Sequence, residues 1–459
     1  MSSQIVSSKS KEQIQGSSVR GAKLISEATS PLKVQKYLLP SGITLIYHPE
    51  HSAPLVTYQT WYGVGSGHEC KGYTGIAHLF EHLMFKATTK YEEGEYDRIL
   101  EEAGGQVNAA TWLDWTYYYA DVPSEALPKL IELEADRMQG LMLDSHQLEA
   151  ERKVVINERK ECVEDDPDAQ LSEHLWHLML GDQHPYGHPT IGWMDDIEKI
   201  SLEDCQQFYR RFYAPDQAII VVAGDVQLPD LIDTIEDAYG PLTQSIKTQS
   251  LREIASSPEQ YMRDVDVPIS FVEYQLQTSC PRLLIGLYAE SALTVDSVYY
   301  ELLDEVLFAG DSSRIYRELI LEREWAISLG LSLPQFKGDS ILELSMELHE
   351  GIDPHMVVTL IFDMIEQVAQ EGLTDGEWQR AKNQVEVQSY RALQTLQQRG
   401  SALGFWETIA GDFRTLFART EQIESCTQVE VQRVANELCD VQRRCVIYNR
   451  SVDIHGKGE

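Results

Sequence analysis

The sequence has no uninterrupted apolar run of about eighteen residues, the length that a membrane-spanning helix needs, so we expect no membrane span. The first 30 residues also lack the apolar segment of a secretory signal, because they are polar and rich in serine. We therefore expect residues 1–30 to form a disordered tail.

The seven cysteines include no Cys-x-x-Cys pair and are scattered along the chain, at positions 70, 162, 205, 280, 426, 439 and 445. This odd, unpatterned set argues against a thiolate zinc site and against a disulfide framework. Reduced thiols fit a cytosolic protein best. We expect a cytoplasmic location, with the periplasm or an organelle as the alternative if a leader has been removed.

Basic residues are scarce, with 38 Lys and Arg against 73 Asp and Glu, and the formal net charge is −35. Because phosphate groups would be repelled, this balance argues against a nucleic-acid partner. An acidic surface favours basic peptides as substrates, although solubility alone explains the charge equally well.

The chain is long enough, at 459 residues with 43% hydrophobic content, for two or more domains. A polar stretch divides it, and we expect these parts: an N-terminal domain at 31–243, a linker at 244–261, a C-terminal domain at 262–450 and a tail at 451–459.

The two predicted domains share short sequence matches. Residues 77–85 (AHLFEHLMF) resemble residues 300–308 (YELLDEVLF), and residues 149–158 resemble 377–386. The offsets, 300 − 77 = 223 and 377 − 149 = 228, differ by the length of one loop insertion. Tandem duplication explains both matches, although matches this short also arise by chance. The second copy carries Glu301 and Glu305 where the first has histidines.

Residues 72–86 (GYTGIAHLFEHLMFK) are apolar at helical spacing on most sides, which predicts a buried helix. Its three polar residues, His78, Glu81 and His82, form H-x-x-E-H, the inverse of the commoner H-E-x-x-H zinc motif. Histidines four residues apart project from one helix face, which suits two ligands of one zinc ion. Glu81, three residues after His78 and next to His82, is expected to direct its carboxylate to the same point.

A catalytic zinc needs a third protein ligand. The best candidate is Glu158 on a predicted helix at 147–161, with Glu151 two turns earlier on the same face as a hydrogen-bond partner for a ligand. The alternative is that this helix is simply charged and solvated.

Other polar groups favour structural roles. The pairs His174/His177 and His184/His188 lack a third ligand at a convincing spacing, and His184-Pro-Tyr-Gly187 reads as a turn. Residues 310–314 (GDSSR) resemble a phosphate loop only superficially.

The motif HLFEH, followed by Glu158 at 158 − 82 = 76 residues after its second histidine, resembles the pitrilysin-type (M16) metallopeptidases, and most closely their processing-peptidase-like branch. The resemblance spans most of residues 33–440. It includes these segments: LPSGITLIY from residue 39, GGQVNAAT at 104–111, ERKVVINERKECVEDDP from residue 151, HPYG at 184–187, FYRRFYAP at 208–215 and IIVVAGD at 219–225.

This resemblance implies roles for single residues. It implies that His78, His82 and Glu158 bind one Zn²⁺ per chain, that Glu81 is the general base and that Glu151 is an auxiliary glutamate. It also implies that Asn108, Ala109, Ala110 and Thr111 form an edge strand to which substrate adds as a β-strand. Asn108 then holds a substrate carbonyl.

One departure concerns the second half. By the same resemblance, active members of the family carry in this half an Arg and a Tyr, seven residues apart, that reach the substrate. In this sequence Ile320 and Ile327 stand at those positions. Apolar side chains cannot donate to a developing oxyanion. We expect a homologous Arg/Tyr-bearing subunit to complete a heterodimer, with a homodimer as the alternative.

The resemblance implies an α+β fold with two tandem homologous α/β roll domains, each an antiparallel-rich sheet with helices, forming half of a clam-shell dimer. The predicted function is a zinc-dependent endopeptidase acting on peptides or unfolded segments inside a closed chamber. The rival is a non-catalytic scaffold subunit of the same fold.

Overall fold

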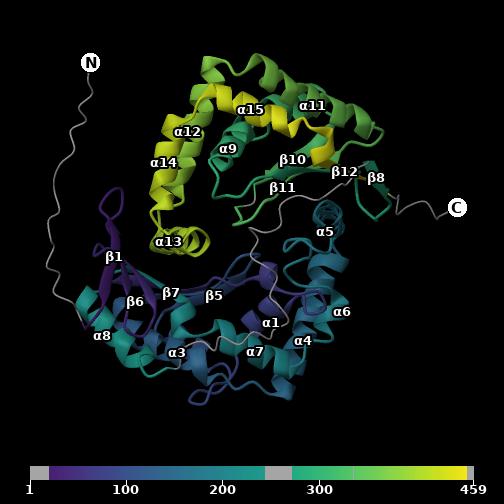
Figure 1. Ribbon diagram of the computed structural model, residues 1–459. Coiled ribbons are helices and arrows are strands. Elements are labelled where there is room, and N and C mark those ends of the chain that lie inside the picture. The colour runs from purple at the N-terminus through teal and green to yellow at the C-terminus, as the bar shows by residue number, and fades with distance from the viewer. Residues whose placement is uncertain (1–19, 243–270, 334, 452–459) are drawn as a thin grey trace, which may run out of the picture.

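The computed structural model describes residues 20–242, 271–333 and 335–451, and Figure 1 shows their arrangement as two halves, each built on one sheet. The predicted linker at 244–261 lies outside the described residues, as do residues 1–19 and 452–459 of the predicted tails. Within the described ranges, no helix is long and apolar enough to cross a membrane.

The first half contains a seven-stranded sheet with the order β1-β2-β3-β7-β4-β6-β5. Its strands are β1 (Lys23–Ala28), β2 (Val34–Leu38), β3 (Thr44–Pro49), β4 (Leu55–Tyr62), β5 (Gln106–Thr111), β6 (Thr116–Pro123) and β7 (Ala218–Gly224). Only β3 and β7 run parallel to each other. The turn between β2 and β3 contains Gly42, at a φ of 94° that favours glycine.

The prediction of a disordered tail over residues 1–30 is wrong for residues 23–28. These residues form β1, which pairs antiparallel with β2 as the outermost strand of the sheet. Serine-rich composition does not reveal this pairing, because the backbone of β2 supplies the hydrogen bonds.

The second half contains a five-stranded sheet with the order β10-β11-β9-β12-β8. Its strands are β8 (Phe271–Tyr274), β9 (Arg282–Ala289), β10 (Ala326–Ser332), β11 (Ser340–Leu348) and β12 (Arg444–Asn449). Only β8 and β12 run parallel. The order β8-β12-β9-β11-β10 therefore repeats β3-β7-β4-β6-β5 of the first sheet, with the same strand directions. This shared topology supports the predicted tandem duplication.

Helices lie between corresponding strands in the two halves, and the first half has the additional helix α8 after β7. The first half has α1 (Ile76–Leu83), α2 (Glu95–Glu102), α3 (Leu127–Gly140), α4 (Ser145–Arg159), α5 (Pro167–Leu180), α6 (Met194–Ile197), α7 (Leu202–Phe212) and α8 (Leu228–Tyr239). The second has α9 (Asp296–Leu307), α10 (Arg314–Tyr316), α11 (Pro354–Glu371), α12 (Asp375–Arg391), α13 (Leu396–Ala410), α14 (Thr415–Ser425) and α15 (Gln428–Leu438).

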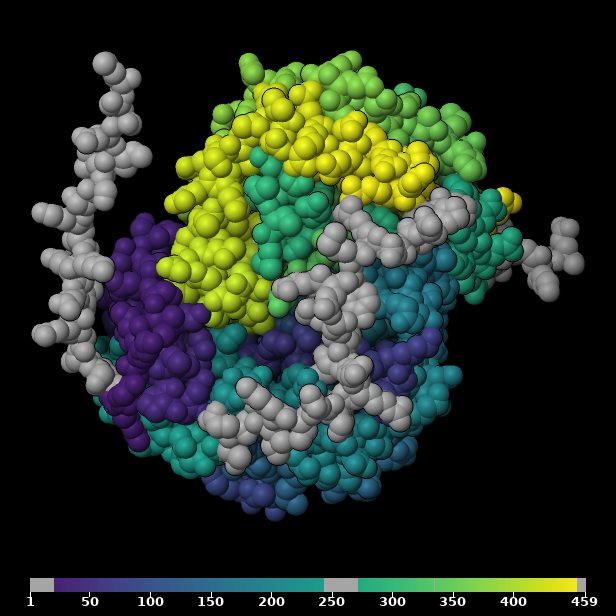
Figure 2. All heavy atoms as spheres, viewed as in Figure 1, coloured from purple at the N-terminus to yellow at the C-terminus, as the bar shows by residue number. Residues whose placement is uncertain are grey.

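Two helices pack on the sheet of the opposite half. Helix α5 of the first half covers the second sheet. The two pack so closely that a Cβ added at Gly286 of β9 would lie 2.2 Å from Met179 Sδ of α5. Helix α13 of the second half covers the first sheet, and a Cβ added at Gly404 would lie 2.2 Å from Trp61 Nε1. Figure 2 shows the yellow-green residues of the second half directly against the purple N-terminal segment. Each half thus contributes one helix to the sheet of the other, and these contacts hold the two halves together.

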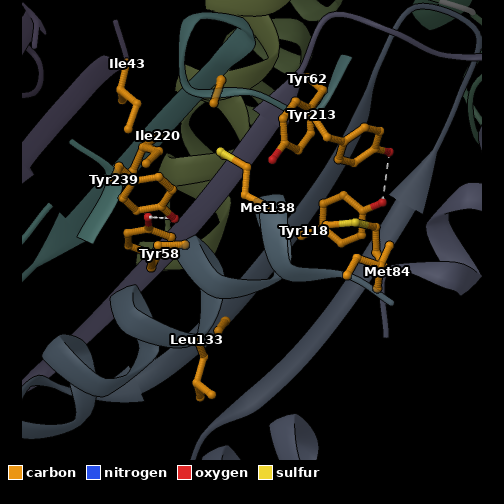
Figure 3. Packing of buried hydrophobic residues seen from close by; sticks show 14 of the residues in the cluster. Ile43, Tyr58, Tyr62, Met84, Tyr118, Leu133, Met138, Tyr213, Ile220 and Tyr239 are labelled. Carbon is orange, nitrogen blue, oxygen red and sulfur yellow. Dashed lines mark hydrogen bonds between the residues drawn. The ribbon is translucent and has the colours of Figure 1, made fainter. Parts of the chain in front are cut away.

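The main core of the first half lies between its sheet and helices α1, α3, α7 and α8. Aromatic side chains fill it, and the hydroxyl groups of Tyr118 and Tyr213 lie 3.1 Å apart within it (Figure 3). Leu79, Phe80 and Leu83 of α1 are fully buried there. Each such side chain contributes about 2 kcal/mol on burial, so this face of α1 is held firmly against the core.

Candidate metal centre

Helix α1 presents its polar residues on the side away from the core. The predicted helix at 72–86 is shorter in the structure, because Gly75 adopts a φ of 91° and α1 begins after it. Phe80 packs against Tyr213, with ring centroids 4.7 Å apart, which fixes the rotation of the helix. His78, Glu81 and His82 are thereby directed to one place.

The structure brings His78, His82 and Glu158 together. One ligand atom from each lies within 4.8 Å of the others, and no other such group occurs among the described residues. Glu158 Oε1 lies 3.6 Å from His78 Nε2, and Glu158 Oε2 lies 3.3 Å from His82 Nε2. Ligand atoms on a tetrahedral zinc with bonds of about 2.1 Å are roughly 3.4 Å apart, so these side chains fit that ion.

The two histidines have opposite electrostatic surroundings. Burial lowers the pKa of His78 to about 4, although Glu158 opposes this shift. Burial also acts to lower the pKa of His82, but the Glu151 and Glu158 carboxylates outweigh it and raise that pKa to about 9. Nδ1 of His78 is buried and has no hydrogen-bond partner within the described part of the chain. A bound cation would favour the neutral, ligating form of both rings.

Glu158 comes from α4, which spans 145–159 rather than the predicted 147–161 and continues as a π-helical turn over 160–164. The hydrogen bond between the Glu158 side chain and His82 lowers the pKa of Glu158, so the carboxylate is ionised. Asp144 caps the start of α4 by accepting from the backbone N–H of His146 and Gln147. An ionised carboxylate is the form that binds a metal ion.

Glu151 lies behind His82, on the same side of α4 as Glu158. Glu151 Oε2 is 3.5 Å from His82 Nδ1, and Lys86 Nζ is 2.6 Å from Glu151 Oε1. The sequence interpretation missed Lys86, which lies just beyond the end of α1 and is brought to Glu151 by the turn that follows the helix. Lys86 and His82 therefore hold this carboxylate from two sides.

Glu81 lies beside this group without belonging to it. Thr111 Oγ1 donates a hydrogen bond of 2.6 Å to Glu81 Oε2. Burial raises the pKa of Glu81, and the Thr111 hydroxyl opposes that shift. A carboxylate held beside a metal position in this way is placed to exchange protons with a group bound there.

The predicted substrate strand is β5, the last strand of the first sheet. It pairs with β6 on one side only within the described residues, so its other edge offers backbone hydrogen-bonding groups. Val107 and Ala109 pack against the core. Asn108 and Ala110, being one residue out of phase, lie on the opposite face.

The alternative histidines contact neighbouring residues of the fold. His174 stacks on Tyr274 at a centroid distance of 4.9 Å, and His177 donates from Nδ1 to Gly187 O at 3.0 Å. Arg314, from the loop that resembles a phosphate loop, forms ion-paired hydrogen bonds with Glu377.

The second half has no metal group among the described residues at the position equivalent to the motif. Glu301 pairs with Arg419, and Glu305 accepts from Gln388 Nε2 at 2.6 Å. Ile320 packs on the core of this half, and Ile327 is exposed on β10.

Comparison with known proteins fits this division of roles. The family described as Insulinase (Peptidase family M16) matches residues 45–192, and Peptidase M16 inactive domain matches residues 199–385. The second match begins before the structural boundary, since β7 and α8 belong to the first half.

Two relatives are similar in sequence. A Mycobacterium tuberculosis protein, named an uncharacterized zinc protease, is 28% identical over 418 residues, covering 90% of this chain and 92% of the relative. The beta subunit of the mitochondrial-processing peptidase of Blastocladiella emersonii is 28% identical over 241 residues, covering 52% of this chain and 51% of that protein.

Two solved structures share the fold. A protease from Helicobacter pylori superposes with a TM-score of 0.83 at 24% identity, covering 91% of this chain and 99% of that one. Pitrilysin superposes with a TM-score of 0.73 at 17% identity, covering 95% of this chain and 47% of pitrilysin.

Proposed function

We propose that this chain, which belongs to the M16 peptidase family, is a zinc-dependent endopeptidase with His78, His82 and Glu158 as the ligands of one Zn²⁺. The observation that carries the proposal is the spacing of 3.3 and 3.6 Å between Glu158 and the two rings, which suits a tetrahedral ion. Relatives named zinc proteases support the choice of metal.

When bound, zinc supplies Lewis acidity that makes water more acidic and polarises a peptide carbonyl. Glu81 is the general base: it accepts the proton of the attacking water and passes it to the leaving amine. Thr111 orients the Glu81 carboxylate, and Glu151 orients the His82 ring through Nδ1.

Substrate binds along the free edge of β5 as an added strand, across residues Asn108, Ala109, Ala110 and Thr111. The Asn108 side chain holds a substrate carbonyl. Beyond Thr111, a pocket of about 240 Å³ is lined by Trp112, Trp176 and Phe336 among others, and it suits an apolar side chain of the substrate. Backbone pairing is tolerant of sequence, so this pocket and the negative charge of the chain set the preference, with basic peptides favoured.

The active assembly is a heterodimer with a homologous subunit that supplies an Arg and a Tyr, because Ile320 and Ile327 cannot stabilise an oxyanion. The chain covers 47% of pitrilysin, so pitrilysin is long enough for two such chains. Two chains facing each other enclose a chamber that admits peptides and unfolded segments. A homodimer is the alternative, and the proposed location is the cytoplasm, which free thiols favour.

Metal analysis together with Glu81→Gln tests the proposal. The wild-type chain should bind one zinc and, with its partner, cleave unfolded peptides, whereas the variant should keep zinc and lose cleavage. Equal cleavage by both proteins would contradict the base assignment. If the chain alone cleaves as fast as with an Arg/Tyr-bearing subunit, the heterodimer proposal is wrong.

The second candidate is a non-catalytic scaffold of the same fold. The two candidates differ in the expected zinc binding of the wild-type chain, because a scaffold has no need to bind zinc. A folded wild-type chain that binds no zinc at micromolar concentrations would favour this alternative.

A further inference from the structure

The first turn of α1 is held by a buried acid outside the proposed ligand set, Glu69. Its side chain is 0% exposed. It accepts hydrogen bonds from the backbone N–H of Gly75 at 2.8 Å and of Ala77 at 2.7 Å. The residue at the start of α1 is Gly75, which has no side chain to cap the helix. Glu69 therefore satisfies N–H groups that a capping side chain would otherwise bind.

His188 holds Glu69 from the other side. His188 Nε2 lies 3.2 Å from Glu69 Oε2 and 3.0 Å from the carbonyl oxygen of Ser66. Both neighbours are acceptors, so Nε2 carries the proton and donates to them. Burial raises the pKa of Glu69, and the His188 contact and the two backbone N–H groups favour the ionised form.

A second acid fixes the loop between Glu69 and α1. Asp196 Oδ2 accepts from the N–H of Gly72 at 3.1 Å and from Thr74 Oγ1 at 2.9 Å. Asp196 thus fixes the loop at Gly72 and Thr74. Glu69 has a defined position relative to the first turn of α1.

This arrangement affects the metal position electrostatically. His78 is the third residue of α1, and a helix N-terminus carries a partial charge of roughly +0.5, which disfavours a cation bound at the first turn. The negative charge of the Glu69 carboxylate, which is hydrogen-bonded to amide groups of that turn, offsets this effect. The carboxylate also prevents the first turn from fraying, so that the His78 ring stays opposite Glu158.

We propose that Glu69, held by His188, is a positioning residue for metal binding: it fixes the first turn of α1 and cancels its positive end, so that His78 can bind a cation. This inference rests on the proposed function, because it concerns the same site. Glu69 itself contacts neither the metal position nor the substrate strand.

Zinc affinity, measured by competition with a chromogenic chelator, tests this inference. Glu69→Gln keeps the size of the side chain and removes its charge, and we expect a zinc dissociation constant about ten-fold higher. The visible absorption bands of the cobalt-substituted protein should also shift, because the His78 ring moves. His188→Gln retains an N–H donor and should bind zinc like the wild type, whereas His188→Leu should be weakened.

Glu236→Gln is the matched control. Glu236 is also a buried carboxylate, and it accepts from Ser41 N at 3.1 Å and Ser41 Oγ at 2.5 Å, at the turn between β2 and β3. This variant should lose thermal stability and keep the zinc affinity and cobalt spectrum of the wild type.

The outcomes separate the two proposals. If the folded wild type binds no zinc, the proposed function itself fails. If the wild type binds zinc and Glu69→Gln binds it equally well, or if Glu236→Gln weakens binding as much, the inference about Glu69 is wrong and the proposed function stands. Should Glu69→Gln fail to fold, equal zinc affinity of His188→Leu and His188→Gln would overturn the inference.

Discussion

Thr111 Oγ1 lies 2.6 Å from Glu81 Oε2, so the last residue of the edge strand β5 is hydrogen-bonded to the proposed general base. The strand proposed to bind substrate and the residue proposed to move its protons are therefore connected directly. A change at Thr111 should affect turnover more than binding.

We expect Thr111→Val to lower kcat about ten-fold with little change in KM, because the isosteric side chain leaves the carboxylate without the hydroxyl that orients it. Thr111→Ser keeps a hydroxyl and should retain most of the activity. Steady-state kinetics on an unfolded peptide measure both. A change confined to KM would contradict the orienting role.

Glu158→Gln should abolish zinc binding at micromolar concentrations and leave the fold intact, because the amide is a poor zinc ligand and the side chain is partly exposed. Glu161, about one turn further along and exposed, gives the control variant Glu161→Gln, which should bind zinc normally. Metal content after dialysis, with circular dichroism of each variant, decides the question. Full zinc content in Glu158→Gln would exclude this ligand.

Lys86→Met should weaken zinc binding about ten-fold, because Glu151 loses the ammonium group 2.6 Å away and no longer holds His82 in one orientation. Lys86→Arg retains the charge and should bind zinc nearly as well as the wild type. Isothermal titration with Zn²⁺ compares the variants. Equal affinities in Lys86→Met and the wild type would show that Glu151 needs no such support.

The ion pair between Arg314 and Glu377 should make stability depend on pH. The hydrogen bonds from Arg314 lower the pKa of Glu377 to about 2, from an ordinary value of 4.5. A lowered pKa contributes stability above the unfolded pKa, and this contribution is lost as pH falls from 4.5 towards 2. Glu377→Gln should therefore lower Tm at pH 7 and change it little near pH 2. An equal difference at both pH values would contradict this origin.

Gly404→Ala should destabilise the protein by about 2 kcal/mol, because the added Cβ would lie 2.2 Å from Trp61 Nε1 and push α13 away from the first sheet. Gly376 in α12 has open space around a Cβ, so Gly376→Ala should be neutral or slightly stabilising. Urea unfolding compares the two. Similar unfolding midpoints would mean that α13 can shift at no cost.

The sequence predicted the local parts of the site well, because helical spacing alone places His78 and His82 on one face. It predicted α4 with boundaries two residues late, because the Asp144 cap lies outside the apolar pattern. Strand β1 was missed, since its polar residues pair through the backbone with β2.

Features that depend on distant partners were not visible in the sequence. Nothing in the apolar pattern of α5 or α13 says which sheet each helix covers, and each packs on the sheet of the other half. Glu69 is an isolated acid in the sequence, and only the fold places it against the N–H groups of Gly75 and Ala77.

The sequence by itself determined that two imidazoles and a carboxylate share one side of a buried helix, and this pattern predicts a site that binds a metal ion and exchanges protons. Only the tertiary structure decided that Glu158 meets those imidazoles at distances suited to zinc, that Thr111 and Lys86 contact Glu81 and Glu151, and that Glu69 holds the first turn of α1. The physical reason is that helical periodicity fixes relations within a few residues, whereas contacts between elements depend on how the two cores and their exchanged helices pack.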